Sequence, residues 1–395
     1  GIQMATALSA IANGGVLMKP QVVERITSEK GEVIQSFQPE AVRRVISEET
    51  SRKVIALLKA TTEKGGTGEQ AVPQGYEVAG KTGTAQKVDS ILGGYSEDRF
   101  TSGFMGFAPA ASPNFRPLHF EAAIKAGKHV FMEKPVAVDP PGARKIIEAG
   151  ELARKNGLAV VAGTQRRHQA NYQRIQYAVE RGAIGKIVGG CVWWCGGALW
   201  YKTKDPNESD ADYMVRNWVS FTEMSGDHIV EQHVHNLDVA NWYIGHTPDN
   251  ALGFGGRARR KTGNQFDFHS VDYDYGDGLH IHSMCRQING TDGGVQESFI
   301  GTEGQTMGGG GLKGKDIKPP DFPDRNAYVQ EHVDLLESIL KNEPLNEARN
   351  VADSTLTAIM GRIATYTGKM VRWKDLTENT GSPWYNLTLT PTAAD

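Results

Sequence analysis

The sequence is poor in cysteine and contains no long apolar run. Its 395 residues include three cysteines, Cys191, Cys195 and Cys285. An odd and sparse set of this kind argues against a disulfide framework and indicates a reducing compartment. No segment approaches the roughly 20 apolar residues that cross a bilayer, and no charged and then apolar leader opens the chain. The sequence therefore predicts a soluble protein, and its start at Gly1 inside an amphipathic pattern predicts a piece of a longer chain.

The sequence also lacks an excess of basic residues. It has 43 Lys and Arg against 46 Asp and Glu, which gives a formal net charge of −3. Proteins that neutralise nucleic-acid phosphates usually carry a basic field, so nucleic-acid binding is not expected. The 39% hydrophobic and 23% charged residues are ordinary for a globular protein. A chain of this length favours about two to three domains.

Four short motifs follow one another in the first 114 residues. They are the segment 3–15, which ends in Asn13-Gly14-Gly15, then Gly66-Thr67-Gly68, then Lys81-Thr82-Gly83-Thr84, then the segment 104–109. In this order they resemble the C-terminal part of a class B penicillin-binding protein transpeptidase domain, which has a serine β-lactamase-like fold. The resemblance implies that Lys81 helps to hold a substrate carboxylate and that the strand after Gly83 docks a peptide. Residues 1–114 are therefore expected to be a partial transpeptidase segment, which would be periplasmic in its parent.

This segment lacks the serine that transpeptidase chemistry requires. A serine hydroxyl attacks a carbonyl only when a neighbouring base takes its proton, and the family provides both groups upstream of Lys-Thr-Gly. Ser338-Ile339-Leu340-Lys341 fits Ser-x-x-Lys but lies in a predicted helix with a buried stripe. Ser112-Pro113-Asn114 fits Ser-x-Asn but follows Lys81. The remnant Lys81, Thr82, Gly83 and Thr84 is therefore expected to be inactive.

From Arg116 onward the pattern changes to alternating helices and strands. The order is a helix at 118–126, a strand at 128–132, a helix that begins after Asp139 and ends before Gly157, and an apolar strand at 158–162. Pro140 in the first turn and a glycine beyond the end are typical helix boundaries. This alternation predicts a parallel α/β sheet.

Three further motifs carry a second resemblance. They are Glu133-Lys134-Pro135, the segment 182–187, and the stretch from Gly226-Asp227-His228 to His235-Asn236-Leu237-Asp238, with Trp242 and Gly245 beyond it. Residues 115–395 are similar to the Gfo/Idh/MocA oxidoreductases, which are cytoplasmic enzymes. The resemblance implies that 115–165 is a C-terminal remnant of a Rossmann NAD(P)-binding domain. It implies that 166–395 is an α+β substrate domain with a large, mostly antiparallel open sheet, whose C-terminal helices return to the remnant.

The second resemblance also implies a chemistry. Such enzymes transfer a hydride between NAD or NADP and a secondary hydroxyl of a sugar or cyclitol. The resemblance also implies that the chain could form a homo-oligomer through the sheet of its substrate domain. The reaction needs a base for the hydroxyl proton and a cation beside the developing alkoxide. The resemblance assigns these roles to His235 and Lys134, and a histidine pKa lies near the working pH. An interior histidine with a structural role is the alternative for His235.

Acidic residues precede this histidine at helical spacing. Asp227, Glu231 and His235 are placed at i, i+4 and i+8, which predicts one polar face of a helix. A carboxylate there could orient the imidazole or raise its basicity. The family usually has Asp four residues before the histidine, and Glu231 takes that place here. A metal site formed by His228, Glu231, His233 and His235 is the alternative, but no metal is expected because His233 would point away from that face.

The remaining candidate residues flank the chemical pair. Glu133, Lys134, Pro135, Gln165 and Arg166 are expected near the nicotinamide. Trp193, Trp200 and Tyr201, with Trp194, form an aromatic group that could stack on a sugar ring or pack in the sheet. Solvated loop positions are the alternative for Gln165 and Arg166.

The start of a dinucleotide fold is missing. Such a fold begins with a strand, Gly-x-Gly-x-x-Gly and a helix, and nothing upstream of Glu133 matches. A literal match at 309–314 precedes Pro319-Pro320, so no helix is expected there. Oxidoreductase activity is therefore expected to be impaired. Two alternatives are a penicillin-binding module and a chimera with no selected function, since the two families belong to different compartments.

Overall fold

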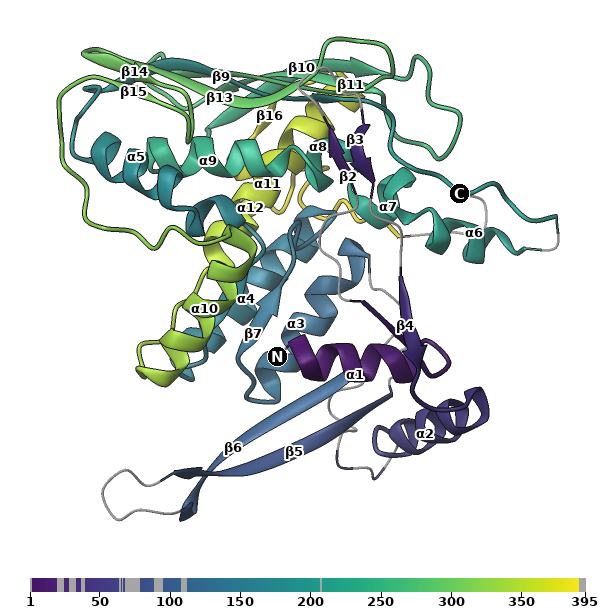
Figure 1. The fold of residues 1–395 in the computed structure, drawn as a ribbon. Helices are drawn as coiled ribbons and strands as arrows, with labels where there is room; N and C mark the ends of the chain where they lie inside the picture. The colour runs from purple at the N-terminus through teal and green to yellow at the C-terminus, as the bar shows by residue number, and fades with distance from the viewer. Residues whose placement is uncertain are drawn as a thin grey trace. The chain divides into compact units, whose positions relative to one another are not determined.

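A computed structural model describes residues 2–19, 25–27, 33–36, 40–63, 65, 67, 79–88, 95–107, 112–206 and 208–390. The chain divides into two compact units, Gly1–Ala110 and Ala111–Asp395 (Figure 1). The described part contains no helix that is long and apolar enough to cross a membrane.

The first unit consists of helices and antiparallel strand pairs. Its elements are α1 (Ile2–Ala12), β1 (Val16–Met18), β2 (Arg25–Thr27), β3 (Val33–Ser36), β4 (Ala41–Arg44), α2 (Glu48–Ala60), β5 (Ala79–Val88) and β6 (Tyr95–Phe107). The strands pair as β1 with β4, β2 with β3, and β5 with β6. Helix α1 is followed by Gly14 and Gly15, whose φ angles of 63° and 89° are typical just past a helix end. Helix α2 is capped by Ser47, whose side chain accepts a hydrogen bond from the Thr50 N–H at 3.0 Å.

The Lys-Thr-Gly motif lies in the longest strand pair of this unit. In the antiparallel register of β5 and β6, Lys81 faces Met105, Gly83 faces Gly103, and Thr84 faces Ser102. The segment 66–68 lies mostly outside the described residues. The motif therefore occupies a paired strand, as the resemblance implies.

The second unit opens with a short parallel α/β region. Its elements are η2 (Pro113–Phe115), α3 (Arg116–Lys125), β7 (Val130–Met132), α4 (Pro140–Lys155), β8 (Val160–Ala162) and η3 (Gln165–His168). The strands β7 and β8 pair in parallel and form a sheet of two strands. Helix α4 begins where predicted, because the Asp139 carboxylate accepts from the Gly142 N–H at 2.8 Å. The prediction of a remnant parallel sheet is confirmed.

Apolar side chains cover both faces of this small sheet. Val160 and Ala162 pack in one cluster with Ile124 of α3 and Ile146 of α4, and all four are fully buried. The alternate residue Val161 packs on the other face against Leu335 of α10 (Ala327–Leu340). A strand that is buried on both faces is typical of parallel sheets.

A large open sheet dominates the rest of the unit. It has eight strands in the order β15-β14-β13-β9-β12-β11-β10-β16. Their bounds are β9 (Ile187–Gly196), β10 (Asn250–Gly256), β11 (Phe268–Asp274), β12 (His280–Gln287), β13 (Gly294–Gly301), β14 (Gly304–Thr306), β15 (Leu312–Lys313) and β16 (Val371–Arg372). The pair β9 and β12 is parallel and the other pairs are antiparallel. The predicted large, mostly antiparallel sheet is confirmed.

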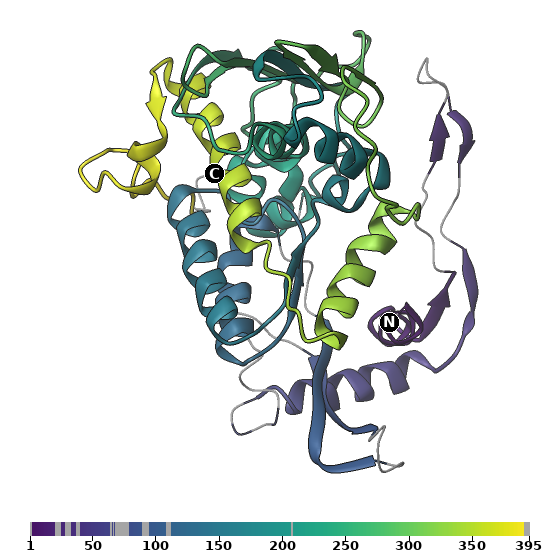
Figure 2. The same ribbon diagram turned by 90° about the vertical axis from the view of Figure 1, so that its left-hand side faces the viewer.

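Helices cover one face of the large sheet (Figure 2). They are α5 (Ala170–Glu180), α8 (His228–Glu231), α9 (Val234–Ile244) and α11 (Ala348–Thr367), with α6 (Asp210–Arg216), η4 (Trp218–Ser220), α7 (Thr222–Ser225) and α12 (Trp373–Thr377) at the edges. Fully buried side chains such as Ile229, Leu237 and Ile359 join these helices to the sheet. On the strands, large apolar side chains including Phe254, Ile300 and Val188 remain exposed.

The structure contradicts one local prediction and agrees with another. The single helix expected to carry Asp227, Glu231 and His235 is wrong: α8 ends at Glu231, and α9 begins at Val234. The break follows from the backbone, because the His233 N–H bonds to the His228 carbonyl and the chain turns before α9. The glycine run at 309–314 lies around β15 in the β14–β15 hairpin, where no helix begins.

Candidate active site

A partly buried ion pair joins the end of the small parallel sheet to α8. Lys134 follows β7, and its Nζ donates to the Glu231 Oε1 at 3.1 Å and to the Glu231 carbonyl oxygen. The two side chains are 14% and 15% exposed. The geometry therefore brings together two of the three predicted catalytic residues, which are 97 positions apart in the sequence.

His235 lies close to this pair in the first turn of α9. Its side chain is 6% exposed, and its Nδ1 is buried without a hydrogen-bond partner among the described residues. Burial lowers the pKa of His235 well below its usual value, and the cations Lys134 and Arg166 lower it further. The imidazole is therefore neutral at physiological pH.

The expected orientation of His235 by a carboxylate is wrong. Glu231 bonds to Lys134 and makes no hydrogen bond to His235. The imidazole instead stacks on Trp194, with ring centroids 5.9 Å apart and an interplanar angle of 22°. An aromatic face thus fixes the imidazole plane where the sequence pattern predicts a carboxylate.

The residues expected near a nicotinamide lie in two groups. Arg166 forms a buried ion pair with Glu297 of β13 and lies 5.9 Å from the Trp194 ring, on the His235 side. Glu133 lies against Gly163, where an added Cβ would come within 2.3 Å of its carboxylate. Gln165 approaches Tyr328 of α10 at 3.5 Å. Lys134 and Arg166 are therefore near enough to His235 to lower its pKa, whereas Glu133 and Gln165 lie toward α10.

The Arg166–Glu297 pair belongs to a larger hydrogen-bonded network. Glu297 also accepts from the Asn236 Nδ2 at 2.7 Å and from the Tyr172 hydroxyl at 3.1 Å. Asn236 directly follows His235, so this network fixes the start of α9 to strand β13. Glu297 and Tyr172 carry no local sequence signal for this role, because their partners lie far away in the sequence.

The aromatic residues do not form one group. Trp194 lies against His235, and since side chains alternate along a strand, Trp193 points to the opposite face of β9. Trp193 is therefore not placed to stack on a substrate beside His235. Trp200 and Tyr201 are 52% and 56% exposed, and Tyr201 lines a separate cavity of about 330 Å³.

A cation that the sequence analysis missed also adjoins the site. Arg116, at the start of α3, donates through its guanidinium to the Pro135 carbonyl oxygen. Burial lowers its pKa to about 10, although the carboxylates of Glu133 and Glu231 oppose this effect. Arg116 thus fixes the Glu133-Lys134-Pro135 turn from the side of α3.

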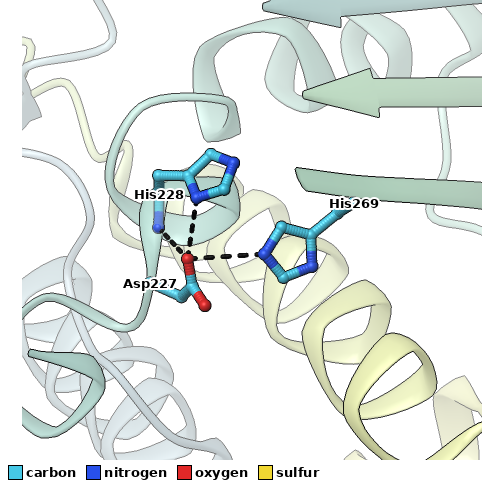
Figure 3. A group of neighbouring side chains, drawn as sticks. All are labelled: Asp227, His228 and His269. Atoms are coloured by element: carbon cyan, nitrogen blue, oxygen red, sulfur yellow. Dashed lines mark hydrogen bonds and ion pairs between the residues drawn. The ribbon is translucent and has the colours of Figure 1, made fainter. Parts of the chain in front are cut away.

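A second buried cluster lies at the start of α8 (Figure 3). The Asp227 Oδ1 accepts from the His228 N–H at 2.5 Å and Nδ1 at 2.9 Å, and lies 3.4 Å from the His269 Nε2. Its Oδ2 accepts from the Tyr366 hydroxyl at 2.6 Å and from the Phe266 N–H at 3.2 Å. Burial alone raises the pKa of Asp227, but the imidazoles of His269 and His228 outweigh it and hold that pKa well below its usual value.

This cluster differs from the possible metal site that the sequence suggests, which consists of His228, Glu231, His233 and His235. One ligand atom each from Asp227, His228 and His269 lies within 4.8 Å of the others, as a metal site would require. The Asp227 Oδ1 already bonds to the His228 Nδ1 and pairs with the His269 Nε2, whereas the Nε2 atoms of His228 and His269 are buried without a hydrogen-bond partner among the described residues. The residues of the sequence-based set do not converge: His233 bonds to Ser283 at 2.7 Å, and His235 stacks on Trp194.

The fold of the second unit is that of Gfo/Idh/MocA-type dehydrogenases. GenD2 from gentamicin A biosynthesis, solved in complex with NAD, has a TM-score of 0.52 and 17% identity over 67% of this chain and 76% of its own. The WlbA dehydrogenase from Bordetella pertussis, solved with NADH and UDP-GlcNAcA, has a TM-score of 0.52 and 16% identity over 67% and 77%. An oxidoreductase from Thermotoga maritima matches at 0.52 and 20% over the same shares. The first unit is too short to account for matches of this length.

The N-terminal residues match a different family. Residues 1–121 match the penicillin binding protein transpeptidase domain. The penicillin-binding protein PbpB of Mycolicibacterium smegmatis is 36% identical over 120 residues, which are 29% of this chain and 18% of that protein. The stage V sporulation protein D of Bacillus subtilis is 42% identical over 114 residues, 29% of this chain and 17% of that protein. The chain thus spans less than a fifth of these two relatives, and the prediction of two unrelated segments in one chain is confirmed.

Proposed function

We propose that the second unit is a Gfo/Idh/MocA-type oxidoreductase for a secondary hydroxyl of a sugar or cyclitol. The observation that carries the proposal is the partly buried Lys134–Glu231 pair, whose lysine acts electrostatically on a neutral His235. A base and a cation in one buried site are what the removal of a hydroxyl proton requires. The fold, which this unit shares with solved dehydrogenases, supports the proposal.

Each member of the site has a distinct task in this proposal. An ammonium group has three N–H donors, and Glu231 accepts from Lys134 with two oxygens. One donor is thereby left for the substrate oxygen, where it would steady the negative charge. His235 takes the hydroxyl proton, and its burial, together with the neighbouring cations, keeps it unprotonated before the substrate binds. Trp194 holds the imidazole plane during the transfer.

The family resemblance implies NAD or NADP as the hydride acceptor, but the described residues do not fit the whole cofactor. A diphosphate is bound by a glycine turn that leads into a helix N-terminus. Within the described part of 112–390, the parallel sheet has two strands, and the glycine run 309–314 lies in a hairpin. We therefore propose that NAD(H) and NADP(H) bind weakly or not at all, and that oxidoreductase activity is impaired.

A titration and a rate measurement test these two statements. Isothermal titration with NAD⁺ is expected to show no saturation below the millimolar range, and micromolar affinity would contradict the impairment. At high NAD⁺, slow oxidation of myo-inositol or glucose should be abolished in Lys134→Met and His235→Asn, and retained in Lys145→Met, which changes an exposed cation. If the two site variants turn over like the natural chain, the catalytic assignment is wrong.

A second candidate function belongs to the first unit. Its sequence identity with penicillin-binding proteins and the strand position of Lys81 favour a penicillin-binding module. The family's Ser-x-x-Lys motif is absent upstream of Lys81. A fluorescent penicillin is therefore expected to leave the chain unlabelled, and stoichiometric labelling would refute this.

The third candidate is a chimera with no selected function. The two segments resemble a periplasmic and a cytoplasmic family, and we propose a cytoplasmic location only for the oxidoreductase part. Trypsin should cleave after Arg99 and spare Arg116, because Pro117 follows it. Mass spectrometry of the native source should then detect the peptide 100–125, and consistent failure to find it would show that the join is an artefact.

A further inference from the structure

A cavity of about 330 Å³ lies at one end of the large sheet. The loop after β10 contributes Arg259, Arg260 and Lys261 to its wall, and Tyr201 and Gln287 complete the part considered below. Three consecutive cations around one small cavity repel one another, and this repulsion raises the free energy of the folded chain. Such a wall suits an anionic ligand.

A buried carboxylate fixes the shape of the basic loop. Asp267 is 1% exposed, and its Oδ2 accepts the backbone N–H groups of Ala258, Arg259 at 2.6 Å and Arg260 at 3.0 Å. Burial alone raises the pKa of Asp267, but these backbone hydrogen bonds and Arg260 outweigh it and lower that pKa. The carboxylate therefore remains ionised and holds three successive residues of the loop.

Arg260 is the most buried of the three cations. Its side chain is 10% exposed, and its Nη2 donates to the Gln287 Oε1 at 2.5 Å. Its Nε lies 3.6 Å from Asp267, which is too far for a hydrogen bond, and is buried without a partner. An unpaired donor on a buried guanidinium is an unfilled position for an acceptor.

The other two cations are not neutralised by the protein. Among the described residues, the Arg259 guanidinium approaches only the Asn289 carbonyl, at 3.5 Å. Lys261 forms no ion pair or hydrogen bond with any part of the chain that the structure describes. Three positive side chains and the single negative charge of Asp267 leave the cavity wall with two positive charges.

The cavity is connected to the candidate active site by one hydrogen bond. The Gln287 Nε2 donates to the Gln232 Oε1 at 2.7 Å, and Gln232 directly follows Glu231, which holds Lys134. A ligand group in the cavity would thus lie beside the loop that links α8 to α9. Tyr201 offers an aromatic surface at the same cavity, and such a ring can pack against the apolar face of a sugar.

We propose that this cavity binds the phosphate or carboxylate group of an anionic sugar, which is the substrate of the oxidation proposed above. That the sugar is a substrate rests on the proposed function, but anion binding itself can be measured without turnover. The volume suits a small polar group with part of a ring, at the lower end of ligand sites.

Calorimetric titrations with three probes at low salt test the proposal. Glucose 6-phosphate, glucuronate and glucose are compared, and at least one anionic sugar should bind about tenfold more tightly than glucose, the effect of one charge-assisted hydrogen bond. Preference between the two anions identifies the ligand group as a phosphate or a carboxylate. Equal affinities for all three probes would overturn the proposal.

Two double variants test whether the anionic sugar binds to the cations of this cavity or to positive charge elsewhere on the surface. Arg259→Ala with Lys261→Ala should lower the affinity for the anionic sugar about tenfold or more. Lys315→Ala with Lys341→Ala removes the same charge from exposed sites and should leave it unchanged. An unaffected Arg259/Lys261 variant would refute the cavity as the binding site.

The two proposals can fail separately. His235→Asn should retain binding of the anionic sugar, because His235 does not line the cavity. Anion binding together with oxidation that Lys134→Met and His235→Asn do not reduce would leave the cavity proposal standing and reject the proposed function. Oxidation of neutral sugars without a preference for anions would do the reverse.

Discussion

Two buried polar groups of the second unit differ in how far their polar atoms are paired. Both carboxylate oxygens of Asp227 accept hydrogen bonds from imidazole, hydroxyl or backbone groups. The Nδ1 of His235 is equally buried but has no partner among the described residues. An unpaired buried polar atom costs about 1–3 kcal/mol. The difference indicates that Asp227 stabilises the fold, whereas the unpaired nitrogen of His235 is available for the role proposed above.

The largest expected effect is the loss of Asp227. Removing one partner of a buried charged cluster typically costs about 3–5 kcal/mol, so Asp227→Ala should lower the free energy of unfolding of the second unit by about that amount. His235→Asn should change it by less than about 1 kcal/mol, because no hydrogen bond is lost. Urea denaturation followed by tryptophan fluorescence measures both. Equal destabilisation by the two variants would break the comparison.

A second contrast is between His168 and His235, two buried histidines whose pKa values shift in opposite directions. Burial alone lowers the pKa of His168, but hydrogen bonds with Asp334 and Glu347 outweigh it and raise that pKa to about 9. A raised folded-state pKa gives stability that is fully present below the unfolded pKa of about 6.5 and is lost as pH rises through the folded value. The second unit should therefore lose on the order of 3 kcal/mol between pH 6.5 and 9.5.

The control for this contrast is His168→Gln. The variant should be less stable at pH 6 and should show a flatter stability profile above pH 6.5 than the natural chain. His280→Gln changes an exposed histidine whose pKa Asp272 also raises, and it should flatten the slope much less, because solvent screens that pair. Parallel profiles for the natural chain and His168→Gln would show that the carboxylates do not hold a proton on His168.

The third prediction concerns the cation beside His235. Burial is the main reason that the pKa of His235 is low, and Lys134 adds to it. Lys134→Met should therefore raise the pKa of His235 without restoring its usual value, because burial remains. Nitrogen-15 NMR titration of the histidines measures this, and Lys145→Met is the matched control. An unchanged His235 titration in Lys134→Met would mean that the two groups do not interact.

Local signals made much of the fold predictable from the sequence. Asp139 and Gly157 mark the ends of α4 because a cap and a left-handed glycine act on neighbouring residues only. The break between α8 and α9 was missed because i, i+4 spacing assumes an unbroken helix. The partners of His269 and Glu297 were also missed, since tertiary folding pairs residues that no sequence spacing connects.

The smallest effect tests the network that positions α9. The Tyr172 hydroxyl donates to the Glu297 Oε2 at 3.1 Å, and Glu297 in turn receives Arg166 and Asn236. Tyr172→Phe removes one donor and leaves the other two, so the free energy of unfolding should fall by about 1 kcal/mol. Tyr177→Phe, whose ring lies under the Arg181 guanidinium, keeps its ring contact and should have little effect. If Tyr172→Phe also raises the pKa of His235, the network would reach the imidazole as well as the backbone of α9, because a weaker hold on Arg166 would move that cation away from His235.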